Sequence, residues 1–450
     1  MRVIVVGAGE VGFDVARMLE REQHDVTVID LDPHALENVR DKLDVMTLQG
    51  NGTSAMLLQE AGIKEADMMI AVTTVDEVNI IACMMADRLG VETTVARVRS
   101  SELTHNEAVL KTSDFGIDLA IRPEESAAAE IHRLIRRASA TDVLTFADGR
   151  LQLVGMRLDH QCHLIGRSLQ EIAMAFPDHT FRIMAIVRGI RTILPRGHDV
   201  LQYNDQVFVL ARPKDMPHVA RLMGKQDARM HHIMILGGSQ VGAKVAMQLA
   251  QVKHNNVKLV EPDRERAKEL ADQIPNVLVI HGDATDIDLL VLEGLGEMDA
   301  FVAVTHEEES NLVTCLMAKH LGVRKTVALL SKGAYIPISQ AIGLDAAVST
   351  KLAVSREIMR FLRGNHVLSV ATVHGMDAEI LEIEVEARAP ATRGPLRDLS
   401  LPKGTLIGAV MHGRTVEVAT GQTEIHPGDR VILFALPRCI EAAERYFDRA

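Results

Sequence analysis

The sequence has no tryptophan, 3% aromatic residues and only four cysteines in 450 residues. Those cysteines (Cys83, Cys162, Cys315 and Cys439) are widely spaced and form no CxxC pair, which argues against a disulfide framework or a zinc ribbon and fits a reduced cytosol. The core must then be built from Val, Ile, Leu, Ala and Met. Such a core suits buried parallel strands, so the composition favours an α/β fold.

Long apolar runs and basic runs are also missing. No stretch reaches the ~18–20 apolar residues of a membrane helix, and the chain opens on a strand-like VIVV run rather than a signal peptide. A net charge of −12 argues against a nucleic-acid partner held through its phosphates. We therefore expect a cytoplasmic protein without direct membrane insertion, whose membrane role, if any, comes through a partner.

The signatures of common enzymes and metal sites are absent as well. There is no Walker A lysine, no GxSxG elbow and no His/Asp pair in a substrate domain of the size that a dehydrogenase carries. The pairs His160/His163 and His231/His232 lack metal-ligand spacing, so we expect solvated or capping residues there. Cys83 and Cys315 stand in matching apolar helices and are expected to be small buried side chains.

The chain repeats itself over most of its length. VIVVGAGEVG from Val3 returns as IMILGGSQVG from Ile233, and the block from Met69 returns from Phe301. A smaller β-rich piece follows each large unit. The order is Rossmann-like, small β, Rossmann-like, small β, and the predicted domains are 1–140, 141–228, 229–366 and 367–450.

The first large unit alternates strand and helix patterns. Helix-period segments cover 10–22 and 77–89, and the expected strands are 2–6, 26–29, 44–48, 68–72, 93–98 and 118–121. This alternation predicts right-handed crossovers and a doubly wound parallel sheet. The fold class is therefore α/β, with two Rossmann-like sheets each followed by a small α+β lobe. A ligand would lie beyond the carboxyl ends of the strands.

A glycine-rich loop joins the first strand to the first helix, with the sequence Gly7-Ala8-Gly9-Glu10-Val11-Gly12. Gly7 would permit the tight turn, Gly9 the approach of a pyrophosphate, and Gly12 close packing of helix and strand, while the amides from Glu10 onward face the ligand. Asp30 ends the second strand, where it would bind both ribose hydroxyls and repel a 2′-phosphate. The alternative is that the glycines serve only chain geometry.

The second half keeps this outline imperfectly in the loop Gly237-Gly238-Ser239-Gln240-Val241-Gly242, with Glu261 as the acid. Ser239 stands where the close-approach glycine is expected, and its hydroxymethyl group could crowd the pyrophosphate or bond to it. The third strands end at Gly50-Asn51-Gly52-Thr53 and Gly282-Asp283-Ala284-Thr285. Asn51, Thr53, Asp283 and Ala284 would contact adenosine, or these segments are turns in which Thr is the helix N-cap.

Polar segments also leave the fourth and fifth strands. Thr73 with Asp76, and Thr305 with Glu308, predict capping boxes. Asn79 and Asn311 recur one turn later, where an amide suits a ribose or phosphate. Arg97 and Arg99 end the fifth strand and could grip phosphates, the alternative being an exposed salt bridge. Their counterparts are Leu329 and Ser331, so the second site is expected to bind polyphosphates less well.

Together, the duplicated order, the TxxDExN-like segments and the closing TLIGAVMHGR…IHPGDRVILF resemble the TrkA family, the tandem RCK (KTN) proteins with TrkA-C lobes that regulate Trk-type potassium uptake. The resemblance covers almost the whole chain. It implies a non-enzymatic, homotetrameric gating ring that binds NAD(H) and ATP/ADP on the inner face of the membrane, beneath a TrkH/TrkG-like potassium-translocating subunit. It places nucleotide contacts on Gly7, Gly9, Gly12, Asp30, Thr73, Asp76, Asn79 and Arg97.

Two other functions remain open at this point. A regulator of another cation transporter, such as an antiporter, would share these nucleotide motifs, because partner identity lies on the docking surface. An NAD-dependent oxidoreductase would share the glycine-rich loops but would need a catalytic domain, and the β-rich pieces of about 70–85 residues are short for one.

Overall fold

The computed structural model describes residues 1–99, 110–137, 140–176, 180–189, 191–225, 230–283, 285–332, 335–362, 367–372 and 378–448. The chain forms two compact units, one of Met1–Ala127 with Ser349–Leu362 and the other of Ala128–Val348 with Arg363–Ala450. Among the described residues, the apolar helices are all too short to cross a bilayer.

The first unit contains a six-stranded parallel sheet in the order β3-β2-β1-β4-β5-β6. Its elements are β1 (Arg2–Val6), α1 (Glu10–Arg21), β2 (Asp25–Asp30), α2 (Pro33–Lys42), β3 (Met46–Gln49), α3 (Ala55–Glu60), β4 (Met68–Ala71), α4 (Asp76–Arg88), β5 (Thr93–Arg97) and β6 (Leu119–Ile121), with α5 (Pro123–Arg136) beginning at its end. Short 3-10 turns lie at Ile63–Glu65 and Thr112–Phe115. The predicted doubly wound sheet is confirmed.

This strand order positions the candidate site. The chain runs outward from β1 to β3 on one side and from β4 to β6 on the other, so the connections diverge between β1 and β4. Doubly wound sheets bind their ligands at the loops that leave the carboxyl ends of the two strands where the connections diverge. All four residues of β4 are buried, as expected for a central parallel strand covered on both faces.

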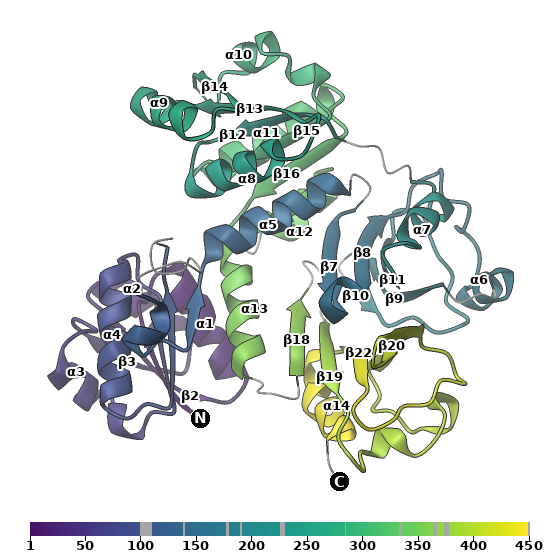
Figure 1. The fold of residues 1–450 in the computed structure, drawn as a ribbon, viewed down its shortest axis with the longest axis horizontal. Coiled ribbons are helices and arrows are strands. Elements are labelled where there is room, and N and C mark those ends of the chain that lie inside the picture. Colours follow the sequence, from purple (N-terminus) through teal and green to yellow (C-terminus); the bar gives the residue numbers. More distant parts are fainter. Residues whose placement is uncertain are drawn as a thin grey trace. The chain divides into compact units, whose positions relative to one another are not determined.

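A helix from far along the chain completes the first unit. Helix α13 (Thr350–Leu362) packs against α1, and Val354 and Ile358 are fully buried in the same cluster as Val15 and Leu19 (Figure 1). Lys351 Nζ lies 3.0 Å from Glu10 Oε2. The sequence repeat predicts that α13 belongs to the second Rossmann domain, 229–366. It packs in the first unit instead, and the repeat alone does not reveal which core a helix joins.

The second unit contains another parallel sheet with the same order, β14-β13-β12-β15-β16-β17. Its elements are β12 (His232–Leu236), α8 (Gln240–Ala250), β13 (Asn256–Glu261), α9 (Arg264–Gln273), β14 (Leu278–His281), α10 (Ile287–Leu292), β15 (Ala300–Ala303), α11 (Glu308–His320), β16 (Lys325–Leu329), α12 (Tyr335–Ala341) and β17 (Ala346–Val348), with a 3-10 turn at Leu295–Glu297. The repeat seen in the sequence is therefore a repeat of topology.

Two small antiparallel sheets complete this unit, in the orders β10-β9-β11-β8-β7 and β18-β19-β22-β20-β21. The first lobe comprises β7 (Asp142–Phe146), β8 (Leu151–Arg157), α6 (Leu169–Ala175), β9 (Phe181–Arg188), β10 (Arg191–Ile193), β11 (Gln206–Ala211) and α7 (Met216–Leu222). The second comprises β18 (Val367–Thr372), β19 (Glu379–Glu384), β20 (Thr405–His412), β21 (Thr415–Val418), β22 (Arg430–Ala435) and α14 (Ile440–Phe447). Short 3-10 turns lie at Ala147–Gly149, Pro390–Thr392, Leu396–Asp398 and Pro437–Cys439.

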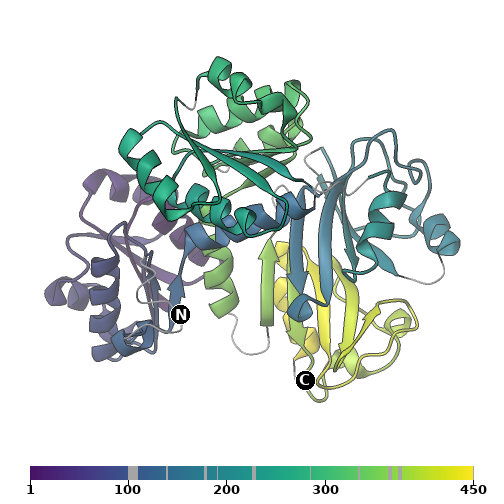
Figure 2. The ribbon, with the colours of Figure 1, turned by 45° about the horizontal axis from the view of Figure 1, so that its top comes forward.

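The two lobes share one buried apolar core. Met184 and Phe208 of the first lobe lie in the same cluster as Ile380 and Phe434 of the second, and Figure 2 shows the two sheets side by side. A Cβ on Gly408 would stand 2.5 Å from the methyl carbon of Met184, so glycine permits this close approach. The lobes therefore pack as a pair, each covering an apolar face that the other would leave exposed.

Candidate functional site

The first glycine-rich loop contains three glycines, and the fold requires Gly7 and Gly12 but not Gly9. Gly7 has φ +109°, and a Cβ on Gly12 would stand 1.8 Å from the carbonyl oxygen of Gly7. Apart from Gly9 itself and its two chain neighbours, no heavy atom of the described residues lies within 4 Å of the place where a Cβ on Gly9 would stand. Chain geometry thus explains Gly7 and Gly12, whereas Gly9 leaves open space through which a ligand can approach the backbone.

The start of helix α1 has the properties of an anion site. Gly9 is the N-cap in an extended conformation, and no side chain in the described part of the chain caps the helix. The first amide bonded back to the cap is that of Phe13, 2.9 Å from the Gly9 carbonyl oxygen. The amides of Glu10, Val11 and Gly12 precede it and point out of the helix end, where they favour a phosphate.

Asp30 holds this loop in place. Its Oδ2 accepts a hydrogen bond from the Ala8 amide at 2.5 Å, and its Oδ1 accepts one from the Asp32 amide at 2.8 Å. The residue is only partly buried. A carboxylate oxygen has a further lone pair, so the same group can still accept hydrogen bonds from ribose hydroxyls.

The second glycine-rich loop differs at its helix. The Ser239 hydroxyl accepts a hydrogen bond from the Gly242 amide at 3.3 Å and donates one to the Val304 carbonyl oxygen at 2.8 Å. Ser239 is thus the N-cap of α8, a role that the sequence-based alternatives of crowding or bonding a pyrophosphate did not include. Ser239 therefore accepts a hydrogen bond from the Gly242 amide. The corresponding amide in α1, that of Gly12, has no such partner in the described chain and is open to a ligand.

The acid of the second half is also more enclosed. Glu261 is 9% exposed, and its oxygens accept the Gly238 amide at 2.6 Å and the Asp263 amide at 3.0 Å. Arg266 adds a hydrogen bond from Nε to the Gly238 carbonyl oxygen at 3.3 Å. Sequence reasoning missed Arg266. The second loop therefore bonds more to its own chain than the first one does.

The segments after the third strands form turns, and their contact with adenosine stays a prediction. Asn51 Oδ1 accepts the amide and the hydroxyl of Thr53, at 3.0 and 2.9 Å. The expected Thr cap is wrong, because the turn delays the helix by one residue and Ser54 caps α3. The second half repeats these contacts at Asp283, Thr285 and the cap Asp286, while Ala284 lies outside the described residues.

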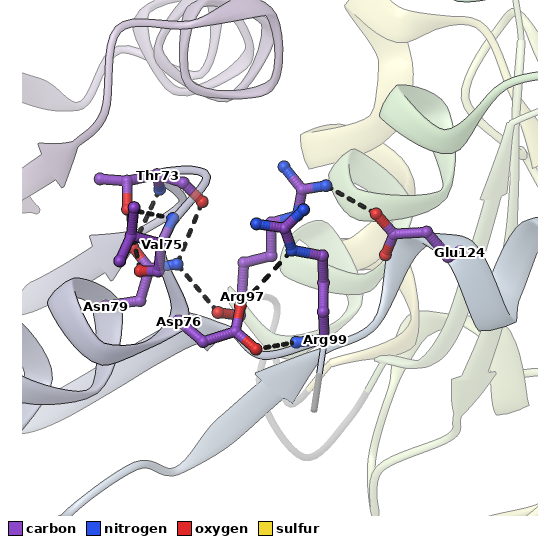
Figure 3. A network of polar contacts seen from close by, with 7 residues as sticks. All are labelled: Thr73, Val75, Asp76, Asn79, Arg97, Arg99 and Glu124. Atoms are coloured by element: carbon purple, nitrogen blue, oxygen red, sulfur yellow. Dashed lines mark hydrogen bonds and ion pairs between the residues drawn. The ribbon is translucent and has the colours of Figure 1, made fainter. Parts of the chain in front are cut away.

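Asn79 joins the ends of strands β4 and β5 (Figure 3). Its Oδ1 accepts the amide and the hydroxyl of Thr73 at 2.9 and 2.7 Å, and its Nδ2 donates to the carbonyl oxygens of Thr73 and Arg97 at 3.1 and 2.9 Å. The side chain is fully buried, and these four bonds use its whole capacity. Its position supports the crevice loops, and direct ligand contact stays a prediction.

Asn311 makes the same four contacts in the second half, with Thr305 and with the Leu329 carbonyl oxygen. It too is fully buried. The recurrence of Asn one turn into the helix is therefore explained by strand-end connection in both halves. Side chains of this kind are seldom inferred from local sequence, because both strands must be placed before the bonds can be drawn.

The predicted capping boxes are wrong. The N-caps of α4 and α11 are Val75 and Glu307, and in the described residues neither has a side-chain cap. Asp76 instead accepts the Arg99 amide at 2.7 Å, and Glu308 accepts the Lys332 amide at 2.9 Å. Each acid is the first helical residue, so it holds the loop that follows the fifth strand rather than its own helix.

Arg97 and Arg99 lie on the same side of β5, as predicted, and both are in ion pairs (Figure 3). Arg97 Nη2 lies 2.7 Å from Glu124 Oε1, each side chain being 14% exposed, and Arg99 Nε lies 3.5 Å from Asp76 Oδ1. Among the described residues, Arg97 Nε is buried without a hydrogen-bond partner. A buried, unsatisfied donor is costly.

The thiols of Cys83 and Cys315 are buried and are not suited to react. Burial raises the pKa of Cys83 to about 12, and it raises the pKa of Cys315 as well. Both side chains are fully buried in their helices. The expectation that they act as small apolar residues is confirmed, since a protonated, enclosed thiol is inert.

Two family models match the chain. The model described as TrkA-N domain matches residues 3–123 and 233–350, and the model described as TrkA-C domain matches residues 153–224 and 380–448. The chain is 33% identical to the Trk system potassium uptake protein TrkA of Halomonas elongata, covering 99% of this chain and 98% of that protein. It is 32% identical to TrkA homolog 1 of Methanosarcina mazei, covering 99% and 100%.

Solved structures share the fold at low sequence identity. A GsuK channel bound to NAD superposes with a TM-score of 0.63 at 17% identity, covering 99% of this chain and 78% of that one. A GsuK bound to ADP gives 0.52 at 15% identity, covering 80% and 69%. At this identity the likeness concerns the fold, and it agrees with the alternation of parallel and antiparallel sheets.

Proposed function

The chain belongs to the TrkA family, and from this premise we propose that it is the nucleotide-binding regulatory subunit of a Trk-type potassium-uptake system. The single observation that carries nucleotide binding is the first glycine-rich loop, with open space at Gly9 and an uncapped helix beside a loop-bound Asp30. The relatives are named for potassium uptake, so the oxidoreductase and antiporter alternatives have no support of their own.

NAD(H) is the proposed ligand of the first site. The pyrophosphate would lie against Gly9 and the amides of α1, and the adenosine ribose would bind Asp30. A channel of the same fold has been solved with NAD bound, which supports this choice. The residues proposed around it are Gly7, Gly9, Glu10, Val11, Gly12, Asp30, Asn51, Thr53, Thr73, Asp76 and Asn79.

ATP and ADP are the proposed polyphosphate ligands of the same crevice. The guanidinium groups of Arg97 and Arg99 would pair with the phosphates. An ADP-bound structure of the same fold supports this class of ligand. The second site, proposed at Gly237, Gly238, Ser239, Gly242, Glu261, Asp283, Ala284, Thr305 and Asn311, lacks both arginines and is expected to bind polyphosphates more weakly.

Regulation would follow from differential affinity. A ligand that binds two conformations of a ring unequally shifts their populations, and a channel coupled to the ring opens or closes accordingly. We propose a homotetramer at the inner face of the membrane, coupled to a TrkH/TrkG-like potassium-translocating subunit. The domain boundaries at residues 140, 228 and 366 belong to the same proposal as divisions along the sequence, with helix α13 packed in the core of the first unit.

Asp30 should make the first site select NADH over NADPH. A carboxylate next to a 2′-phosphate sets like charges together, so we expect wild type to prefer NADH by about tenfold or more, roughly 1.4 kcal/mol. Asp30→Ala should narrow this ratio, while affinity for both ligands falls because the Ala8 amide loses its acceptor. Calorimetry on both ligands measures the ratio. Glu261→Ala is the matched control, and equal wild-type affinities would contradict the assignment.

A further inference from the structure

Four side chains suited to metal ligation meet at one end of the second lobe. His412 ends β20, Glu417 lies on β21, and His426 and Asp429 lie in the turn before β22. His412 Nδ1 lies 2.8 Å from Asp429 Oδ2, and His426 Nδ1 lies 3.6 Å from the same oxygen. One possible ligand atom from each of His412, His426 and Asp429 lies within 4.8 Å of those of the other two.

The four positions that correspond to this cluster in the first lobe contain no histidine. The aligned residues are Arg188, Ile193, Gln202 and Asp205 in place of His412, Glu417, His426 and Asp429. There Arg188 Nε and Nη2 each lie 2.8 Å from one oxygen of Asp205. A two-point ion pair thus ties the strand to the turn in the first lobe.

The backbone around the acid is the same in both lobes. The Gln202 amide donates to Asp205 Oδ2 at 2.8 Å, and the His426 amide donates to Asp429 Oδ2 at 2.7 Å. Only the side chains around a common carboxylate differ. Three positions differ between the lobes: Arg, Ile and Gln in the first lobe are His, Glu and His in the second, all residue types that bind metals or orient metal ligands.

We propose that His412, His426 and Asp429 bind a late first-row divalent cation, Zn²⁺ in the first place. Two imidazole nitrogens and one carboxylate oxygen form a ligand set that suits Zn²⁺ rather than Mg²⁺ or Ca²⁺, which prefer oxygen. Ligand atoms at about 2.0–2.2 Å from a tetrahedral ion lie roughly 3.4 Å apart. The 3.6 Å separation fits this value, and the 2.8 Å separation requires only a small opening of the His412–Asp429 contact.

Glu417 lies next to the proposed ligand His412 and is not itself a proposed ligand. Its Oε2 lies 3.7 Å from His412 Nε2, the ring nitrogen that would not bind the ion, and its Oε1 accepts a hydrogen bond from the Thr423 hydroxyl. Metal-bound histidines commonly give their second N–H to a carboxylate, which fixes the ring. Glu417 is thus a positioning residue.

Solvent can reach the site while the acid stays enclosed. Asp429 is 8% exposed, whereas His412 and His426 are 32% and 63% exposed at their side chains. An ion can therefore enter from solution and complete its coordination with water. Bound metal would connect the end of β20 to the turn before β22, the same two segments that the Arg188–Asp205 pair connects in the first lobe.

The test uses Co²⁺ as a spectroscopic probe on the full-length protein after removal of metals with a chelator. We expect about one Co²⁺ per chain, with the visible absorption of a four- or five-coordinate ion, its displacement by Zn²⁺ and a raised melting temperature. His412→Arg with His426→Gln installs the first-lobe residues, so it should fold and lose all three signals. Glu417→Gln should weaken binding by about 10–100-fold.

His160→Gln with His163→Gln is the matched control, because it removes a different pair of exposed histidines, and it should bind Co²⁺ as wild type does. The proposal is overturned if wild type shows no such absorption. It is equally overturned if the His412→Arg, His426→Gln protein binds Co²⁺ with unchanged affinity, since the cluster would then be only a His–Asp ion pair.

Discussion

A chain carrying Gly9→Asp is expected to bind NADH at least about a hundredfold more weakly than wild type and to melt at the same temperature. A Cβ at Gly9 meets no heavy atom of the described chain within 4 Å beyond its two chain neighbours, so we expect the fold to tolerate the side chain. The added carboxylate stands where the pyrophosphate would approach, and like charges about 4 Å apart near a protein surface repel by about 4 kcal/mol. Calorimetry and thermal melting measure the two effects.

Gly12→Asp is the informative comparison for this experiment. Its Cβ would stand 1.8 Å from the Gly7 carbonyl oxygen, so the loop has to move and both the melting temperature and NADH binding should fall. Loss of binding without loss of stability is therefore specific to Gly9. If Gly9→Asp bound NADH like wild type, the first glycine-rich loop would not be the dinucleotide site.

Arg97→Leu should weaken ATP binding about tenfold to a hundredfold, because one charge-assisted contact contributes roughly 1.5–3 kcal/mol. The corresponding residue in the second half is Leu329, so the variant makes the first site resemble the second at this position. The Arg97 side chain is 14% exposed, and a phosphate would pair with its guanidinium group. Titration calorimetry with ATP measures the change.

The variant Glu124→Gln distinguishes direct contact between Arg97 and ATP from an effect of the Arg97–Glu124 ion pair. If Arg97 mattered only through its 2.7 Å contact with Glu124, both variants would weaken ATP binding equally. We expect Glu124→Gln instead to leave ATP binding unchanged or slightly tighter, because it removes a negative charge that competes with the phosphate. Equal losses in the two variants would contradict a direct phosphate contact from Arg97.

Local pattern predicted much of the fold. The strands expected at 2–6, 68–72 and 93–98 are observed as β1, β4 and β5, and the helix expected at 77–89 is observed at Asp76–Arg88. Parallel strands are covered on both faces, so their apolar runs stand out from the helices between them. The roles of Gly7 and Gly12 were also predictable, because a turn and a close packing contact constrain single residues.

Contacts between distant segments were not predictable. The packing of Val354 against α1, the partner of Arg97 at Glu124 and the four bonds of Asn79 all depend on which strand ends and helices meet. The Ser239 cap was missed because its second partner, the Val304 carbonyl oxygen, lies on another strand. His412 and His426 are separated by a hairpin, and local spacing gives no metal signature for them.

The account as a whole is tested most directly by rubidium or potassium flux through the membrane potassium-translocating protein of the same organism, reconstituted in vesicles with and without this chain. We predict that the chain makes flux depend on NADH and on the ATP/ADP ratio. With Gly9→Asp, the NADH dependence should disappear while the chain still binds the vesicles. Flux that is the same with and without the chain at every nucleotide concentration would contradict a regulatory role.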